Sequence, residues 1–299
     1  MQIQWKSSSS ASCLYAAWQI AQGEAIVDQA LLEALAPHAA KLEGVISQSG
    51  APRGKFWRTL MGLASEYGSN RQLAEVVLAK VLGRNAAQGP ILSPLITAMD
   101  SIEATMLRQL PRLAQELPLR GGPIREQWEA RGPGLVRMVS KLTEEALIPG
   151  QASVVVVHPV SGGGCENYLE GNVVIWEGLL ANAEIRLPEV VRLGWSLLQL
   201  QMDLPMFSEQ LLPGRTLPLA RLALVPAVLQ AAAEVELVHV VPGLLATALK
   251  HWKVLPIEAD SPVVGLLEGW WQDYLQNRPS WANALMALDQ LLGDGLVVD

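Results

Sequence analysis

The chain has 299 residues, of which 50% are hydrophobic and 17% charged, and its formal net charge is −7 at pH 7. So apolar a composition excludes a disordered chain, because it can bury enough surface to offset the entropy lost on ordering. The acidic balance argues against a general nucleic-acid-binding surface.

Cysteine content and hydropathy predict a soluble, cytoplasmic protein. Cys13 and Cys165 are the only cysteines, too few for a disulfide framework, which favours a reducing compartment. The first 12 residues lack the pattern of a secretory signal. The longest uncharged run, 146–165, is interrupted by prolines and three consecutive glycines, so it cannot form the continuous apolar helix of about 20 residues that spans a bilayer. We therefore expect no membrane partner.

Helical periodicity dominates the first 118 residues, where apolar side chains recur at i, i+3 and i+4. Helices are predicted after the serines at 7–10, after Asp28, from Asn70 to Gly83, and from Pro94. Pro37 interrupts the second pattern, so that helix should bend or restart there. These elements make up an N-terminal helical block, residues 1–118.

The composition changes between Leu117 and Gly134. Glycines and prolines crowd both ends of this stretch: Pro118, Gly121, Gly122, Pro123, Gly132, Pro133 and Gly134. Such residues favour a linker or a long loop, with a short helix around 126–130. We therefore place a domain boundary here, with residues 119–299 as a second block, although one continuous domain is the alternative.

A small β-sheet or hairpin is predicted around residues 153–177. The four valines at 154–157 and the apolar run 172–176 are the two strand signals, and a glycine-rich segment separates them. Helices are predicted again at 189–202, 220–238, 242–252, 262–276 and 279–292, and the tail 294–299 could add an edge strand. The fold class is therefore α+β and predominantly helical.

The first candidate site is the loop 158–166, which follows the valine strand. Its glycine N–H groups could form an anion-binding nest, and its imidazole, thiol and carboxylate could act in catalysis or make three metal ligands. The alternative is a flexible hairpin loop without a function. The residues concerned are His158, Gly162, Gly163, Gly164, Cys165 and Glu166.

A second candidate is Cys13 as a nucleophile near a helix N-terminus, where the helix dipole lowers the pKa of a thiol. The order Cys13, His158, Asn172 is similar to that of papain-like hydrolases. That resemblance would imply a thiol hydrolase with Cys13 and His158 at its centre. The sequence departs from the family pattern, because Ser12 stands where a glycine is usual and no glutamine marks an oxyanion donor.

Known catalytic and cofactor motifs are missing from the chain. It contains no His-Glu-x-x-His, no paired Cys-x-x-Cys, no Gly-x-Ser-x-Gly and no Gly-x-Gly-x-x-Gly. We therefore predict neither a metal nor a cofactor.

Arginines near the glycine–proline turns form a basic segment in an otherwise acidic chain. Arg120 and Arg131 are the ones we expect to bind an anionic ligand, since a guanidinium binds phosphate or carboxylate in a bidentate manner. The alternative is that this segment complements the acidic C-terminal region, within one subunit or across a dimer.

Tryptophan is unusually frequent, with ten Trp against two Phe. An aromatic group lies in the last predicted helix pair, and aromatic residues are enriched both in cores and at interfaces. We expect this group to make core or subunit contacts; it consists of Trp270, Trp271, Tyr274 and Trp281.

Two hypotheses about function follow. The leading one is a non-catalytic interaction or ligand-binding protein that self-associates, because the chain is apolar and lacks catalytic motifs. The alternative is a hydrolase or transferase that acts on an anionic small molecule, with His158 as base, Cys165 or Glu166 assisting and Arg131 holding the anion. The thiol hydrolase is the less favoured form of that alternative.

Overall fold

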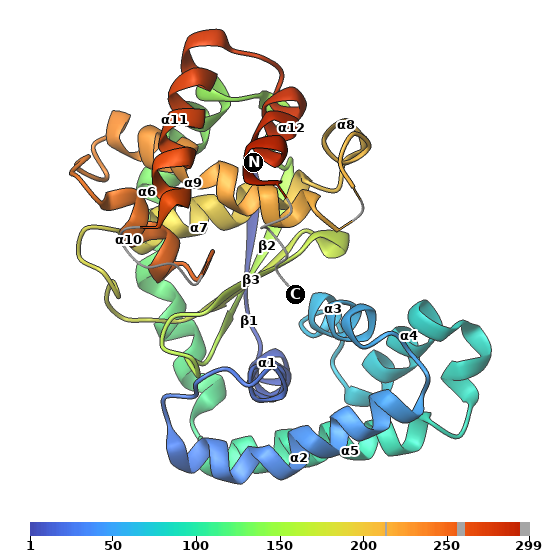
Figure 1. Ribbon diagram of the computed structural model, residues 1–299. Helices are drawn as coiled ribbons and strands as arrows, with labels where there is room; N and C mark the ends of the chain where they lie inside the picture. The colour runs from blue at the N-terminus through green and yellow to red at the C-terminus, as the bar shows by residue number, and fades with distance from the viewer. Residues whose placement is uncertain (213, 256–260, 294–299) are drawn as a thin grey trace. The chain divides into compact units, whose positions relative to one another are not determined.

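A computed structural model describes residues 1–212, 214–255 and 261–293 (Figure 1). The protein is 66% helical and contains a small four-stranded mixed sheet, which confirms the predominantly helical α+β fold class. The edge strand predicted for 294–299 lies outside the described residues.

The sheet has the order β1-β2-β4-β3. Its strands are β1 (Gln2–Ser7), β2 (Gln151–Val157), β3 (Cys165–Tyr168) and β4 (Val173–Glu177). The two predicted strands, β2 and β4, pair in parallel from Ser153↔Val173 to Val157↔Glu177, so they do not form a hairpin. The intervening β3 pairs antiparallel with β4. Because β2 and β4 are parallel, both end at the same edge of the sheet.

The chain divides into two compact units, which we describe separately. The sheet unit comprises residues 3–123 and 153–180, and the helical unit comprises residues 1–2, 124–152 and 181–299. The segment 153–180 thus groups with the N-terminal helices, whereas the sequence placed it with the C-terminal block.

In the sheet unit, helices pack on one face of β2 and β4, where Val155, Val157 and Ile175 enter the core. The side chains of Ser8, Asp28 and Ser69 cap three of the helices by accepting a hydrogen bond from a backbone N–H in the first turn. Helices α2 and α5 run side by side (Figure 1). The helices of this unit are α1 (Ser9–Ala21), α2 (Gln29–Gln48), α3 (Arg53–Leu63), α4 (Asn70–Leu82), η1 (Arg84–Gln88), α5 (Leu92–Gln109) and η3 (Leu169–Gly171), with the first turns of α6 (Leu113–Leu142).

In the helical unit, α9 (Thr216–Glu234) is central and contacts α7, α10, α11 and α12. By length and composition α9 could cross a membrane, and 67% of its most apolar stretch is buried. It is the one described helix that passes this test. The other elements of this unit are the rest of α6, η2 (Glu145–Leu147), α7 (Glu189–Leu198), η4 (Gln199–Gln201), α8 (Pro205–Ser208), α10 (Leu244–His251), α11 (Pro262–Asn277) and α12 (Trp281–Leu292).

The loop or linker expected at 117–134 is instead part of the continuous helix α6. Its prolines and glycines disfavour a helix locally, at up to about 3 kcal/mol for an interior proline. A buried apolar stripe outweighs this preference, because side chains three, four or seven residues apart share one face of a helix. The stripe consists of Leu113, Leu117, Ile124, Trp128, Leu135 and Val139.

Candidate functional site

The glycine-rich loop after β2 forms the predicted nest, and a carboxylate of the chain itself occupies it. Glu177, the last residue of β4, is fully buried. Its two oxygens accept hydrogen bonds from the backbone N–H groups of Val160 (3.0 Å), Ser161 (2.7 Å), Gly163 (2.5 Å) and Gly164 (2.7 Å). The N–H groups expected to bind an external anion are therefore hydrogen-bonded to Glu177.

Glycine is required at several positions of this loop. Gly162 and Gly163 have φ of 77° and 126°, which side chains rarely adopt. A Cβ at Gly164 would lie 2.1 Å from the Tyr15 hydroxyl oxygen and 2.8 Å from Ser161 Oγ. The loop is thus shaped by its contacts with α1 and Glu177.

Glu166 is engaged in a second network. Its carboxylate accepts hydrogen bonds from Trp18 Nε1 (2.8 Å), Tyr168 Oη (2.6 Å) and the Gln19 side-chain amide. These donors come from α1 and β3. Cys165, beside it in β3, is partly exposed. Three donors on one carboxylate hold Glu166 in place, which suits a structural role better than proton transfer.

His158 lies just beyond the end of β2, and its backbone N–H donates to Ser12 Oγ (3.2 Å). Its ring is partly buried, and Nδ1 has no hydrogen-bond partner among the described residues. Burial, with the Arg120 guanidinium nearby, lowers the pKa of His158, so the imidazole is neutral at pH 7. Arg120 itself donates to the carbonyl of Gly178 (3.4 Å). The structure thus brings two predicted site residues, His158 and Arg120, into one neighbourhood.

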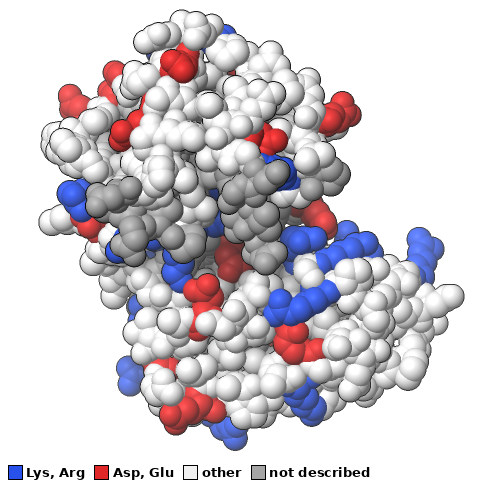
Figure 2. Space-filling view, viewed as in Figure 1, with Lys and Arg blue, Asp and Glu red and all other residues white. Residues whose placement is uncertain are grey.

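The other predicted arginine, Arg131, belongs to the helical unit, where it is exposed on α6. Some basic residues of this segment pair along the helix itself, as Arg125 does with Glu129 at 2.7 Å. On the face in Figure 2, Lys and Arg also gather over α3, whose Arg53 pairs with Glu43 at 3.0 Å.

Cys13 does not have the environment of a nucleophile. Its side chain is 1% exposed, and burial raises the pKa of the thiol to about 12, with Glu103 adding to the shift. A nucleophilic cysteine needs a lowered pKa and access to substrate. Over residues 1–212, 214–255 and 261–293, no three His, Cys, Asp or Glu side chains come together to hold a metal ion.

The aromatic group of α11 and α12 lies inside the helical unit, since Trp270, Trp271, Tyr274 and Trp281 are each at most 4% exposed. Their rings contact one another at centroid distances of 5.2 to 6.1 Å. Trp270 Nε1 donates to the carbonyl of Ala284 (2.9 Å). These side chains therefore form core contacts of the helical unit.

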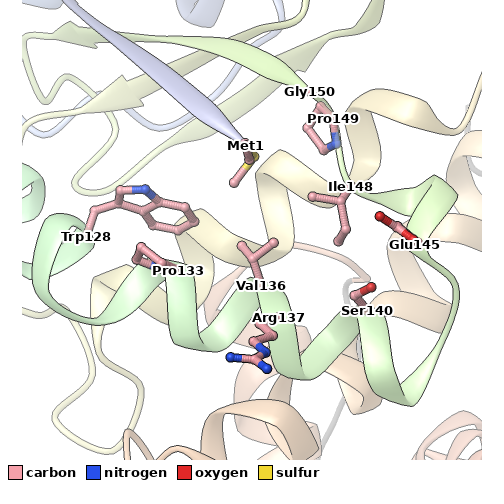
Figure 3. A pocket seen from close by; sticks show the side chains of 10 residues that line it. All are labelled: Met1, Trp128, Pro133, Val136, Arg137, Ser140, Glu145, Ile148, Pro149 and Gly150. Carbon is pink, nitrogen blue, oxygen red and sulfur yellow. The ribbon is translucent and has the colours of Figure 1, made fainter.

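A pocket of about 400 Å³ lies in the helical unit, between α6 and the chain that follows it. The Gln2 N–H donates to the carbonyl of Gly150 (2.8 Å), and this hydrogen bond holds Met1 at the edge of the pocket. Figure 3 shows Trp128 and Val136 on one side, with Ile148 and the Glu145 carboxylate across from them. The lining residues are Met1, Trp128, Pro133, Val136, Arg137, Ser140, Glu145, Ile148, Pro149 and Gly150.

Two glycines fix the aromatic wall of this pocket. A Cβ at Gly132 would lie 2.4 Å from the Trp128 ring, so the indole packs flat against α6 only because residue 132 has no side chain. Gly194 of α7 allows a similar approach, since a Cβ there would lie 2.6 Å from Leu135 Cδ2 and 3.9 Å from the Trp128 ring. Trp128 is 6% exposed, so its position is set by packing before any ligand arrives.

The polar groups of the pocket remain open. Arg137 and Ser140 are three residues apart on α6, and Glu145 lies in η2. Arg137 and Glu145 are exposed, and in the part of the chain that the structure describes neither side chain has a hydrogen-bond or ion-pair partner. Sequence reasoning missed this site because it read 117–134 as a loop; the available signal was the apolar stripe through those residues.

No family model, curated protein or solved structure matches this chain.

Proposed function

We propose that this chain is a non-catalytic protein that binds a small ligand in the pocket beside α6. The observation that carries the proposal is a pocket lined by both apolar and polar side chains, whose two charged side chains, Arg137 and Glu145, have no partner within the described ranges. Small-molecule sites are concave and mostly apolar, with a few polar groups that orient the ligand. Its volume of about 400 Å³ is within the range of such sites.

The state of the expected catalytic groups supports the same proposal. The thiol of Cys13 is buried with a raised pKa, and the carboxylates of Glu166 and Glu177 are each hydrogen-bonded by several donors of the sheet unit. Groups engaged in this way stabilise a fold, whereas catalysis needs groups free to exchange protons or attack a substrate.

The test is ligand-observed NMR with small aromatic compounds. Saturation transfer from the protein should reach some of them in the unmodified protein and be lost in Ser140→Phe, which fills the pocket. Glu126→Phe, an exposed change on the same helix outside the pocket, should leave the signal unchanged. Saturation that is absent from the unmodified protein, or equal in both variants, contradicts a site at this pocket.

A second candidate function, a hydrolase or transferase acting on an anionic small molecule, is supported by His158. The imidazole is neutral and lies near Arg120, and its buried Nδ1 has no hydrogen-bond partner among the described residues, so it could act as a general base if a substrate reached it. This candidate predicts slow turnover of phosphate or carboxylate esters that His158→Gln abolishes. Turnover that is absent, or unchanged in His158→Gln, contradicts it.

A further inference from the structure

We infer that the pocket beside α6 selects a small zwitterion with an apolar body, the class that includes amino acids with large apolar side chains. This inference rests on the proposed function, since it requires that the pocket binds a ligand at all. The observation behind it is that the two charged side chains in the lining, Arg137 and Glu145, have opposite signs and come from different elements, α6 and η2.

The two charges suit two separate groups of one ligand. Although Arg137 and Glu145 line one pocket, no ion pair between them is found among the described residues. A guanidinium binds a carboxylate through two parallel hydrogen bonds, and a carboxylate accepts from an ammonium. In Figure 3 the Arg137 guanidinium points away from Trp128 and Ile148, and because this side chain is exposed on α6 it can change rotamer to meet an anion that enters.

The remaining walls define the rest of the ligand. Trp128, Val136 and Ile148 present apolar surface, and the indole is held in place by the missing side chain at Gly132. Ser140, one turn beyond Arg137, adds a hydroxyl that can donate or accept. An apolar group against the indole, with an ammonium and a carboxylate at the rim, satisfies all of these side chains at once.

The competing ligand classes are simple anions, simple cations and neutral apolar molecules. A ligand with a single charge would leave either Arg137 or Glu145 without a partner at the rim of an occupied pocket. A neutral ligand would leave both side chains without a partner. Four compounds that share one phenyl ring separate these classes: L-phenylalanine, 3-phenylpropanoate without the ammonium, 2-phenylethylamine without the carboxylate, and 2-phenylethanol with neither charge.

Dissociation constants of these four compounds, measured by ligand-observed NMR on the full chain, test the inference. We expect L-phenylalanine to bind about fivefold tighter than either single-charge analogue, since a rim ion pair contributes up to about 1 kcal/mol, which is roughly fivefold in affinity. Equal or tighter binding of one analogue, or of 2-phenylethanol, overturns the inference.

Charge-removing variants assign the two contacts. Arg137→Gln should weaken L-phenylalanine and 3-phenylpropanoate about fivefold and leave 2-phenylethylamine unchanged. Glu145→Gln should weaken L-phenylalanine and 2-phenylethylamine and leave 3-phenylpropanoate unchanged. Arg131→Gln and Glu126→Gln remove exposed charges elsewhere on α6 and should change nothing. Equal losses in these controls would mean that net charge, and not the pocket, controls affinity.

The two proposals fail in different ways. If none of the four compounds binds, or if binding survives Ser140→Phe, the pocket is not a ligand site and the proposed function itself is wrong. If the compounds bind and Ser140→Phe abolishes binding, but the zwitterion has no advantage, only the ligand class is wrong.

Discussion

The carboxylates of the sheet unit and the charged groups of the α6 pocket differ in what they bind. Glu177 accepts four backbone hydrogen bonds and Glu166 accepts three from side chains, all from the sheet unit. Arg137 and Glu145 line a pocket, and neither side chain has a partner among the residues described. Polar groups bonded to their own chain hold a fold together, whereas open groups around a preformed pocket are available to a ligand. The conspicuous glycine loop is therefore a structural region, and the α6 pocket is the region that we propose for ligand binding.

The largest expected effect concerns the thiol of Cys13. With a pKa of about 12 against the ordinary 9.0, its thiolate fraction at pH 8 falls roughly a thousandfold. Iodoacetamide at pH 8, followed by peptide mass spectrometry, should modify Cys13 at least that much more slowly in the native protein than in urea. Similar alkylation rates in the native protein and in urea would mean that Cys13 is an accessible nucleophile. The sheet unit would then also contain a reactive group that is free to meet a ligand.

Loss of the Glu177 carboxylate should destabilise the sheet unit strongly. Glu177→Ala leaves four buried or partly buried N–H groups without their acceptor, at an expected cost of about 4 kcal/mol in the free energy of unfolding. Urea denaturation measures this, and Glu177→Gln, which keeps one acceptor oxygen, serves if the alanine variant does not fold. The exposed Glu170→Gln should change stability by less than about 0.5 kcal/mol. If Glu177→Ala changed stability as little as Glu170→Gln, the glycine loop would not depend on the Glu177 carboxylate.

Two glycine-to-alanine changes in the sheet unit should change the free energy of unfolding in opposite directions. Gly164→Ala places a Cβ against Tyr15 and Ser161 and should lower the free energy of unfolding by about 2 kcal/mol. Gly44→Ala, in α2 with open space around the new methyl group, should raise it by about 0.5 kcal/mol through helix propensity. Thermal unfolding of both variants compares them directly, and a neutral Gly164→Ala would contradict the tight packing of the loop.

A smaller effect than that of Gly164→Ala is expected from alkaline pH, which should lower stability. The folded state keeps Cys13 protonated to about pH 12, whereas the unfolded chain ionises it from about pH 9. Between those values the unfolded state binds fewer protons, so stability falls as pH rises, by about 1 kcal/mol between pH 8 and 10. Urea titrations at both pH values measure this. In Cys13→Ala the free energy of unfolding should fall less steeply between pH 8 and 10. An unchanged pH dependence in this variant would mean that other groups cause the loss of stability.

Much of the fold followed from local patterns in the sequence. The serines at 7–10 and Asp28 correctly placed the starts of the first two helices, and four consecutive valines marked the inner strand β2. The N–H groups of the glycine-rich segment do converge on a carboxylate, as one of the two interpretations of its composition allowed, but that carboxylate is Glu177 of the chain itself. These features depend on neighbours in sequence, which is why composition and periodicity found them.

The rest depended on contacts between distant residues. Glu177 meets the loop only because β2 and β4 are parallel and end at one edge, which the hairpin interpretation did not contain. Helix α6 continues through Pro118, Pro123 and Pro133 because buried side chains on its stripe outweigh local preference, and the pocket exists only once that helix is continuous. The one available signal was Glu177 itself, because a carboxylate directly after the apolar residues of a strand indicates a buried hydrogen-bond acceptor.

The most direct test of the account is a crystal structure of the protein soaked with L-phenylalanine. We expect density for the ligand between Trp128 and Ile148, with its carboxylate on Arg137 and its ammonium on Glu145, and an unchanged Glu177 in the glycine loop. Ligand density at His158 and the 161–164 loop, with the α6 pocket empty, would contradict the central claim and return the functional site to the sheet unit.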